Sequence, residues 1–149
     1  KPTQSGEHTR VPSTFNAKLI HPVVVSAEQV KNAIGKVQII DARSQARFKA
    51  EAPEPRPGLH GGHIPGSLSV PFTELTRDGH LKSPQELKAA FEGLGVDLNK
   101  PVITSCGSGV TAAALAFGLD ALGVKDVLLY DGSWAEWGDV NEDFPIETH

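Results

Sequence analysis

A cysteine begins a glycine-rich loop between two apolar segments in the second half of the chain. Residues 102–105 form a largely apolar run, residues 106–109 read Cys-Gly-Ser-Gly, and residues 112–119 are uncharged and rich in alanine and leucine. This order predicts a buried strand, a tight loop and a helix. A strand followed at once by a helix is the repeating unit of parallel α/β sheets, so this segment favours that fold class for the whole chain.

The same alternation continues along the rest of the chain. Two capping boxes, at residues 26–29 and 83–86, predict where two helices begin. The expected strands lie at residues 37–40, 67–70, 102–105 and 127–130; the expected helices lie at residues 26–34, 45–49, 83–93 and 111–122, with a last short helix that is capped by residues 131–133 and carries Trp134 and Trp137. We therefore expect an α/β fold in which helices cover both faces of a parallel sheet.

Length and composition predict one globular domain with an irregular start. The chain has 149 residues, of which 39% are hydrophobic and 21% are charged, enough to bury a core. Residues 1–22 are polar and broken by prolines, which indicates an interdomain linker or an N-terminal arm before a domain over residues 23–149. Because the chain contains no methionine, even at its first position, we expect it to be a piece of a longer protein.

The net charge and the number of cysteines indicate which classes of partner and which cellular compartment to expect. A net charge of −4 without a basic stripe argues against a nucleic-acid partner. No apolar run reaches about eighteen residues, and the start of the chain has no apolar signal segment, so we expect neither a membrane partner nor a signal peptide. One cysteine cannot form an internal disulfide, which favours a reducing compartment: the cytoplasm, or the mitochondrion in a eukaryote.

Cys106 is the expected nucleophile. Glycines allow successive backbone N–H groups to point at one spot, and the following helix adds the positive end of its dipole. Such surroundings lower a cysteine pKa from about 8.5 to roughly 3.5–7.5. The alternative is a cysteine that only fills space in the core, but a cysteine of that kind is expected within an apolar run and not at the head of a loop at a strand end.

Six short motifs of this chain resemble those of the rhodanese family of sulfurtransferases. They are Asp41-Ala42-Arg43, Arg47-Phe48, Glu54-Pro55-Arg56, Gly62-His63-Ile64-Pro65-Gly66, Cys106-Gly107-Ser108-Gly109-Val110-Thr111 and Tyr130-Asp131-Gly132-Ser133-Trp134-Ala135-Glu136-Trp137. The resemblance implies a rhodanese-like fold with a five-stranded parallel sheet. It is closest to the C-terminal catalytic half of the mercaptopyruvate-type members, which carry two such domains in tandem. By that resemblance residues 23–149 are the catalytic domain, and residues 1–22 connect it to an N-terminal rhodanese domain that this chain lacks.

The resemblance also implies sulfur transfer without a cofactor. A Cys106 thiolate would take the sulfur of 3-mercaptopyruvate, release pyruvate, and pass the sulfur from its persulfide to an acceptor: a small thiol, a thioredoxin-like protein or cyanide. Such chemistry needs a thiol of low pKa and N–H donors that stabilise negative charge on the persulfide. The six histidines have no metal-ligand spacing, so we expect no metal site.

The remaining loop residues have expected roles around the sulfur. Ser108 and Thr111 carry hydroxyls that would hydrogen-bond the thiolate or polarise the donor, although Thr111 is also a candidate helix N-cap. Gly107 and Gly109 permit the curvature of the loop. Together with Val110 these glycines are expected to contact the substrate.

Charge in the loop distinguishes the two donors that the family uses. Thiosulfate is a dianion, and thiosulfate-type members carry basic residues in this loop, whereas here no Lys or Arg lies between Lys100 and Lys125. The neutral loop favours 3-mercaptopyruvate, whose carboxylate would bind the planar forks of Arg47 and Arg56. The alternatives are a surface ion pair between Arg47 and Glu51 and a simply solvated Arg56.

Other residues in the motifs are expected to be structural. Asp41 would brace the carboxyl edge of the sheet, Arg43 would pair locally, and His63 would fix a turn by hydrogen bonding. The two tryptophans of the last helix would pack beneath the end of the sheet, although residues 132–134 are also candidates for the rim of the pocket.

Three other functions stay open. A cysteine phosphatase uses a similar strand–loop–helix cradle, but it needs an arginine six residues after the cysteine, where this chain has Ala112. A thiosulfate:cyanide sulfurtransferase is the alternative donor assignment. A non-catalytic rhodanese-type interaction module is the last, although inert domains typically lose the cysteine that this chain keeps.

Overall fold

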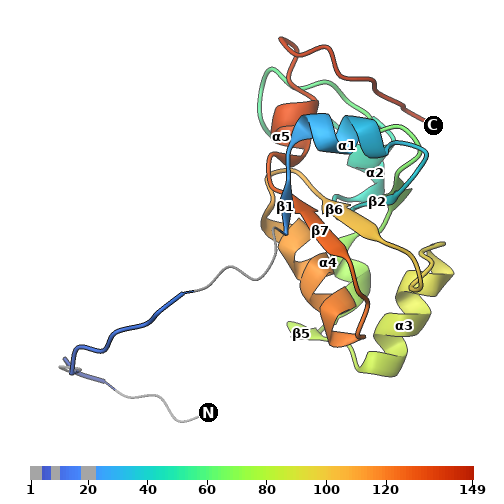
Figure 1. The fold of residues 1–149 in the computed structure, drawn as a ribbon. Coiled ribbons are helices and arrows are strands. Elements are labelled where there is room, and N and C mark those ends of the chain that lie inside the picture. Colours follow the sequence, from blue (N-terminus) through green and yellow to red (C-terminus); the bar gives the residue numbers. More distant parts are fainter. Residues whose placement is uncertain (1–4, 8–10, 18–22) are drawn as a thin grey trace.

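Five parallel strands form the central sheet of the computed structural model, which describes residues 5–7, 11–17 and 23–149 (Figure 1). The strands lie in the order β1 (Val24–Val25), β7 (Val127–Tyr130), β6 (Val102–Ser105), β2 (Gln38–Asp41) and β3 (Leu68–Ser69). This confirms the expected five-stranded parallel sheet. The sequence does not predict β1, because two residues carry no readable periodicity.

Helices cover both faces of the sheet, as expected. α1 (Ala27–Ala33) and α5 (Ser133–Trp137) pack on one face, and α3 (Pro84–Gly93) and α4 (Val110–Ala121) pack on the other (Figure 1). Successive strand residues point to opposite faces. Ile39 therefore joins the core beneath α1 and α5, whereas its neighbour Ile40 joins the core beneath α3 and α4.

Local sequence fixes the starts of two of these helices. Ser26 and Ser83 each accept a hydrogen bond from the backbone three residues on, and Gln29 and Glu86 bond back, so both expected capping boxes are confirmed. The expected helix over 111–122 is confirmed with a one-residue shift, because it runs from Val110 to Ala121.

Short elements join the main ones. α2 (Gln45–Phe48) follows β2, and a 3-10 helix η1 (Phe72–Leu75) precedes a small antiparallel hairpin of β4 (Thr76–Arg77) and β5 (His80–Leu81). The hairpin turns at Asp78-Gly79, where both residues have positive φ, as the tight turns of hairpins require.

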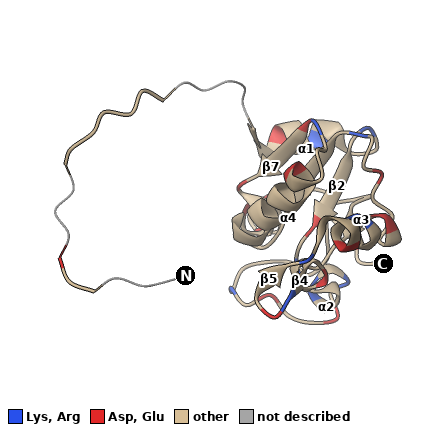
Figure 2. Ribbon diagram, turned by 90° about the horizontal axis from the view of Figure 1, so that it is seen from below, with Lys and Arg blue, Asp and Glu red and all other residues tan. Residues whose placement is uncertain are grey.

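The expected linker at residues 1–22 falls partly on residues 1–4, 8–10 and 18–22, which lie outside the described residues. Residues 5–7 and 11–17 are exposed and form neither helix nor strand. No helix in the described part of the chain has the length and apolar character needed to span a bilayer. Basic and acidic residues are interspersed along the ribbon in the view of Figure 2.

Candidate active site

Cys106 follows directly after β6, at the carboxyl edge of the sheet. Cys106 is only 1% exposed to solvent, yet it lines a cavity of about 320 Å³. The other residues that line this cavity are Arg47, Glu54, Pro55, Arg56, Leu59, Gly107, Ser108, Val110 and Thr111. The structure thus brings together seven of the eight expected site residues, and only Gly109 is not among those that line the cavity.

Gly109 does not line the cavity, but its backbone conformation allows the loop to turn into α4. It has a φ of +82° and occupies the N-cap position of α4. A Cβ at this position would lie 2.8 Å from Oδ1 and 2.9 Å from the carbonyl oxygen of Asp131. Both the backbone conformation and the close neighbour therefore require glycine here.

Gly107 allows a different close approach. A Cβ at Gly107 would lie 2.9 Å from Nη2 of Arg47. The guanidinium of Arg47 therefore packs directly over this glycine, next to the cysteine.

Hydrogen-bond donors surround the thiol of Cys106. The backbone N–H of Ser108 donates to Sγ at 3.4 Å. Burial alone would raise the pKa of the thiol, but hydrogen bonds from the Thr111 hydroxyl and from the N–H groups of Ser108, Ala112 and Thr111 outweigh it. The pKa of Cys106 consequently lies below its ordinary value, because these donors stabilise the thiolate.

The two hydroxyl residues of the loop contribute differently. Thr111 is the second residue of α4, so the helix-capping alternative is wrong, since Gly109 holds the N-cap position. The Thr111 hydroxyl instead helps to lower the pKa of the Cys106 thiol. Ser108 is exposed and lines the cavity, and it reaches the sulfur through its backbone N–H.

Residues 132–134, candidates for the rim of the pocket, are not among those that line the cavity, but Ser133 has a role in the site that the sequence does not predict. Its buried hydroxyl accepts hydrogen bonds from the N–H groups of Cys106 at 3.1 Å and Gly109 at 3.2 Å, and donates to the carbonyl of Tyr130 at 2.8 Å. The N-cap of the last helix is Gly132, within the expected residues 131–133, but it makes no side-chain cap bond. The hydroxyl of Ser133 holds the cysteine loop instead, and the residue has a φ of +52°.

The first turn of α5 fixes the loop carbonyls as well. Trp134 donates its N–H to the carbonyl of Cys106 at 2.9 Å, and Ala135 donates to the carbonyl of Gly107 at 3.0 Å. Holding these carbonyls against α5 leaves the N–H groups farther along the loop free to face the sulfur.

Arg47 pairs with Glu54 and not with Glu51. Its Nη2 lies 2.5 Å from Oε2 and its Nε lies 3.2 Å from Oε1 of Glu54. The alternative of a surface pair with Glu51 is wrong because α2 ends at Phe48, so that residue 51 is not one helical turn further along. Arg56 is exposed and also lines the cavity, so the structure brings both expected arginines to Cys106.

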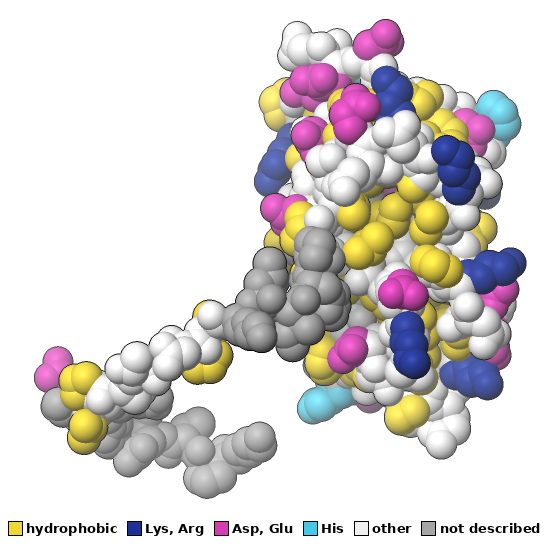
Figure 3. Space-filling model, in the orientation of Figure 1, with side chains coloured by type: hydrophobic (Ala, Val, Ile, Leu, Met, Phe, Trp, Pro, Cys, Tyr) yellow, Lys and Arg dark blue, Asp and Glu magenta, His cyan; other side chains and the backbone are white. Residues whose placement is uncertain are grey.

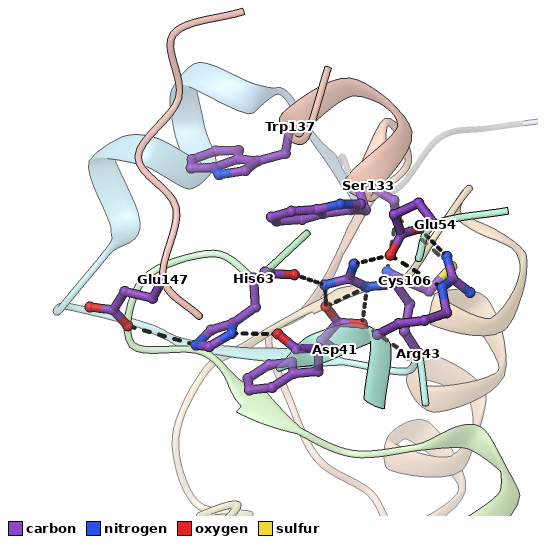
Figure 4. Close-up of polar contacts among 12 residues, drawn as sticks. Asp41, Arg43, Glu54, His63, Cys106, Ser133, Trp137 and Glu147 are labelled. Carbon is purple, nitrogen blue, oxygen red and sulfur yellow. Dashed lines mark hydrogen bonds and ion pairs between the residues drawn. The ribbon is translucent and has the colours of Figure 1, made fainter. Parts of the chain in front are cut away.

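A buried ion cluster lies beside the cavity, with Arg43 at its centre (Figure 4). Arg43 donates to Asp41 at 2.7–3.1 Å, to Glu54 at 2.8 Å and to the carbonyl of Gly62 at 2.7 Å. Its guanidinium also lies 4.2 Å from the ring centroid of Trp134. These contacts confirm that Arg43 pairs locally and that Asp41, the last residue of β2, braces the carboxyl edge of the sheet.

His63 is structural, as expected. Its Nδ1 lies 2.8 Å from the carbonyl of Phe48, its ring stacks on that of Phe48 at 3.7 Å, and its Nε2 lies 3.8 Å from Glu147 (Figure 4). Trp134 and Trp137 are buried against the sheet, which confirms their expected packing.

A larger groove, of about 610 Å³, lies between α4 and β7, away from Cys106. Hydrophobic side chains gather on this face of the molecule in Figure 3, and Val23, Phe117 and Leu129 are among those that line the groove. Its lining contains no cysteine or histidine. Over the described residues, no group of three or more His, Cys, Asp or Glu side chains is placed to hold a metal ion.

The site is a cysteine in a loop of N–H donors at the carboxyl edge of a five-stranded parallel sheet. This arrangement is typical of an α/β protein with a cysteine nucleophile. Residues 26–139 match the Rhodanese-like domain, and the chain belongs to this family. Over 135 residues it is 54% identical to the 3-mercaptopyruvate sulfurtransferase of Escherichia coli strain K12, a match that covers 89% of this chain and 48% of that protein.

The chain is also similar to a second curated protein and to a solved structure. Over 130 residues the chain is 45% identical to the thiosulfate sulfurtransferase of Bos taurus, which covers 85% of this chain and 44% of that protein. The crystal structure of SseA from Escherichia coli superimposes with a TM-score of 0.68 at 51% identity, over 81% of this chain and 45% of that one. The chain spans about half the length of the curated relatives that it matches.

Proposed function

We propose that this chain is the catalytic part of a 3-mercaptopyruvate sulfurtransferase. The observation that carries the proposal is a cysteine of lowered pKa in a cavity that two arginines line and whose own loop has no cation. The identity of 54% to the Escherichia coli enzyme of that name supports the choice of substrate.

The first step moves sulfur from the donor to Cys106. The thiolate attacks the sulfur of 3-mercaptopyruvate, so that a sulfur–sulfur bond forms and the carbon–sulfur bond breaks. The electron pair of the broken bond stays on carbon as the enolate of pyruvate. This carbon takes up the proton that the donor thiol gives up, which releases pyruvate and leaves a Cys106 persulfide anion.

The second step returns the cysteine to its starting state. An acceptor thiol attacks the outer sulfur, the persulfide bond breaks, and its electron pair returns to Cys106 as the thiolate. The acceptor leaves as a hydropersulfide, or as thiocyanate where cyanide is the acceptor. A small thiol and a thioredoxin-like protein are the other acceptors of this proposal.

The cysteine loop supports both steps by stabilising negative charge on sulfur. Ser108 supplies an N–H and Thr111 supplies an N–H and a hydroxyl, and donors of this kind act on charge as it develops. Gly107 and Gly109 allow the curvature that this arrangement needs. Val110, which is exposed and lines the cavity, would contact the bound donor.

The arginines would hold the carboxylate of the keto acid. Arg47 and Arg56 both line the cavity from segments outside the cysteine loop, and a guanidinium binds a carboxylate through two parallel hydrogen bonds. The charge of 3-mercaptopyruvate lies away from its sulfur. This separation fits a site whose cations come from α2 and the proline-rich loop, while the cysteine loop itself carries none.

The proposal extends to the rest of the protein. Residues 23–149 would be the catalytic domain, with residues 1–22 as the linker to an N-terminal rhodanese domain, since the relatives are about twice as long as this chain. The lone thiol supports work in a reducing compartment, either the cytoplasm or the mitochondrion.

Thiosulfate is the alternative donor. The identity of 45% to the bovine thiosulfate sulfurtransferase supports it. The absence of Lys and Arg between residues 100 and 125 favours 3-mercaptopyruvate, because a dianion whose charge adjoins the transferred sulfur needs cations in that loop.

The test is the intact mass of the chain after incubation with 3-mercaptopyruvate. We expect a gain of one sulfur atom that maps to Cys106, release of pyruvate, and loss of the added sulfur on addition of a thiol. Cys106→Ser should fold and gain nothing. If the wild-type chain forms no persulfide with either donor, a non-catalytic rhodanese-type module becomes the better assignment.

A further inference from the structure

Glu54 joins the buried ion cluster to the cavity. It lies in the proline-rich loop after α2, and yet its side chain is only 2% exposed. Its Oε1 accepts from Nη1 of Arg43 at 2.8 Å and from Nε of Arg47 at 3.2 Å, while its Oε2 accepts from Nη2 of Arg47. One carboxylate therefore holds a core arginine and a cavity arginine in fixed positions.

The charges of this group cancel. Asp41 and Glu54 carry two negative charges, and Arg43 and Arg47 carry two positive ones, all linked by direct ion pairs. The charge of Arg47 is thus compensated before a donor binds. Arg56 also lines the cavity, and within the described part of the chain it makes no ion pair.

The pairing with Glu54 also leaves one side of the Arg47 guanidinium, the Nη1 group, available to a ligand. Its Nε and Nη2 are bonded to Glu54, whereas the described residues offer no hydrogen-bond acceptor to Nη1. The guanidinium is held over Gly107, with its side chain 25% exposed. The residues that line the cavity therefore sum to one positive charge while Cys106 is protonated, from Arg47, Arg56 and Glu54.

The geometry points to Glu54 as a specificity-determining residue, an inference that rests on the proposed function. By fixing Arg47 and cancelling one positive charge, Glu54 makes the cavity favour a sulfur donor with one negative charge over a dianion. The donor is selected by the total charge of the groups that line the cavity, to which both a carboxylate outside the cysteine loop and the absence of cations within it contribute.

The test is Glu54→Gln, which keeps the shape of the side chain and removes its charge. We expect the ratio of kcat/KM for thiosulfate to that for 3-mercaptopyruvate to rise by about tenfold, because an additional unit charge near the site acts on a dianion more than on a monoanion. Glu51→Gln is the matched control: it lies in the same part of the chain, is exposed and does not line the cavity, so its ratio should stay at the wild-type value. An unchanged ratio in Glu54→Gln would overturn the proposal.

A second measurement separates this proposal from the proposed function. Cys106 is the only thiol, so its alkylation by anionic iodoacetate and by neutral iodoacetamide can be compared directly. The ratio of the two rates cancels the fraction of thiolate and reports the charge around the sulfur. Glu54→Gln should raise this ratio by about tenfold at low salt. If the wild type transfers no sulfur, the proposed function fails, while the alkylation ratio still decides the role of Glu54.

Arg47→Gln covers the case in which Glu54→Gln does not fold, since Arg43 would lose a buried partner. This variant removes the cation that Glu54 balances and should lower the iodoacetate-to-iodoacetamide ratio by a similar factor. A ratio that stays at the wild-type value would overturn the proposal equally.

Discussion

The hydroxyl oxygen of Ser133 accepts a hydrogen bond from the backbone N–H of Cys106 at 3.1 Å, although 27 residues separate the two along the chain. The same oxygen accepts from Gly109 and lies 4.0 Å from the cysteine sulfur. One buried side chain from α5 therefore ties together both ends of the turn that carries the nucleophile.

Ser133→Ala is expected to loosen the cysteine loop. It leaves three buried backbone groups without a partner, which should lower the free energy of unfolding by on the order of 3 kcal/mol, measured by denaturant unfolding. The pKa of Cys106 should rise, because the N–H donors around the sulfur lose their fixed positions.

Two further variants separate the hydroxyl from other effects. Ser133→Gly should regain about 1 kcal/mol, since it relieves the positive φ, but should leave the raised pKa of Cys106 unchanged. Ser67→Ala removes a buried hydroxyl that has no hydrogen-bond partner and should alter neither quantity. A wild-type cysteine pKa in both Ser133 variants would contradict the role assigned to this side chain.

The pH dependence of alkylation should report the lowered pKa of Cys106. A thiol reacts as its thiolate, so the rate with iodoacetamide rises as pH rises through the pKa of the folded protein and then levels off. Because hydrogen bonds lower that pKa, the midpoint should lie below the value of about 8.5 for a free cysteine.

Thr111→Val tests the side-chain part of this effect. It removes a hydroxyl that lowers the pKa of the Cys106 thiol, so the midpoint should move upward. Thr104→Val is the matched control, because the hydroxyl of Thr104 bonds the carbonyl of Leu128 instead. Equal midpoints in the wild type and Thr111→Val would show that the hydroxyl does not stabilise the thiolate.

Arg47→Lys and Arg56→Lys should each weaken the use of donors that carry a carboxylate. A lysine lacks the planar fork, so kcat/KM for 3-mercaptopyruvate should fall by about tenfold to a hundredfold. An uncharged organic polysulfide donor should lose little. Arg77→Lys, on β4 and paired with Glu86, is the control and should leave both donors unaffected. Equal losses for both donors would mean that the arginines act on the fold or on Cys106.

A cation placed in the cysteine loop should shift the donor preference. Ser108→Lys is the suitable variant, because Ser108 is exposed and lines the cavity, whereas a side chain at Gly107 would displace the guanidinium of Arg47. The ratio of kcat/KM for thiosulfate to that for 3-mercaptopyruvate should rise by at least about tenfold. Ser108→Gln supplies the matched uncharged side chain. The loop-charge argument fails if the two variants give the same ratio.

Gly109→Ala should destabilise the protein more than Gly123→Ala. Both glycines have positive φ, at +82° and +77°, so both variants carry about 1 kcal/mol of backbone strain. Only at Gly109 would the new Cβ meet another group, Asp131, at 2.8 Å. We expect the free energy of unfolding of Gly109→Ala, measured by thermal or denaturant unfolding, to fall by about 1–3 kcal/mol more than that of Gly123→Ala. Equal losses would show that the loop can move away from Asp131 at no cost.

Local patterns in the sequence predict much of this protein. The capping boxes at Ser26 and Ser83, the main strands, and the strand–loop–helix order around Cys106 all follow from spacings within a few residues. The cavity residues of the cysteine loop are predictable for the same reason, because the carboxyl ends of parallel strands meet at one edge of the sheet.

What the sequence does not predict depends on groups that are distant along the chain or outside regular structure. β1 is too short to show a period, and it forms only by pairing with β7. The early end of α2 decides that Arg47 binds Glu54 instead of Glu51.

The sequence by itself determined the α/β class and the place of the nucleophile, since helix caps, glycine loops and apolar periods are properties of neighbouring residues. Only the tertiary structure decided that Ser133 holds the cysteine loop and that Glu54 compensates Arg47. A hydrogen bond or an ion pair of this kind exists only once packing brings its two partners within about 3 Å of each other, and no pattern along the chain encodes that distance.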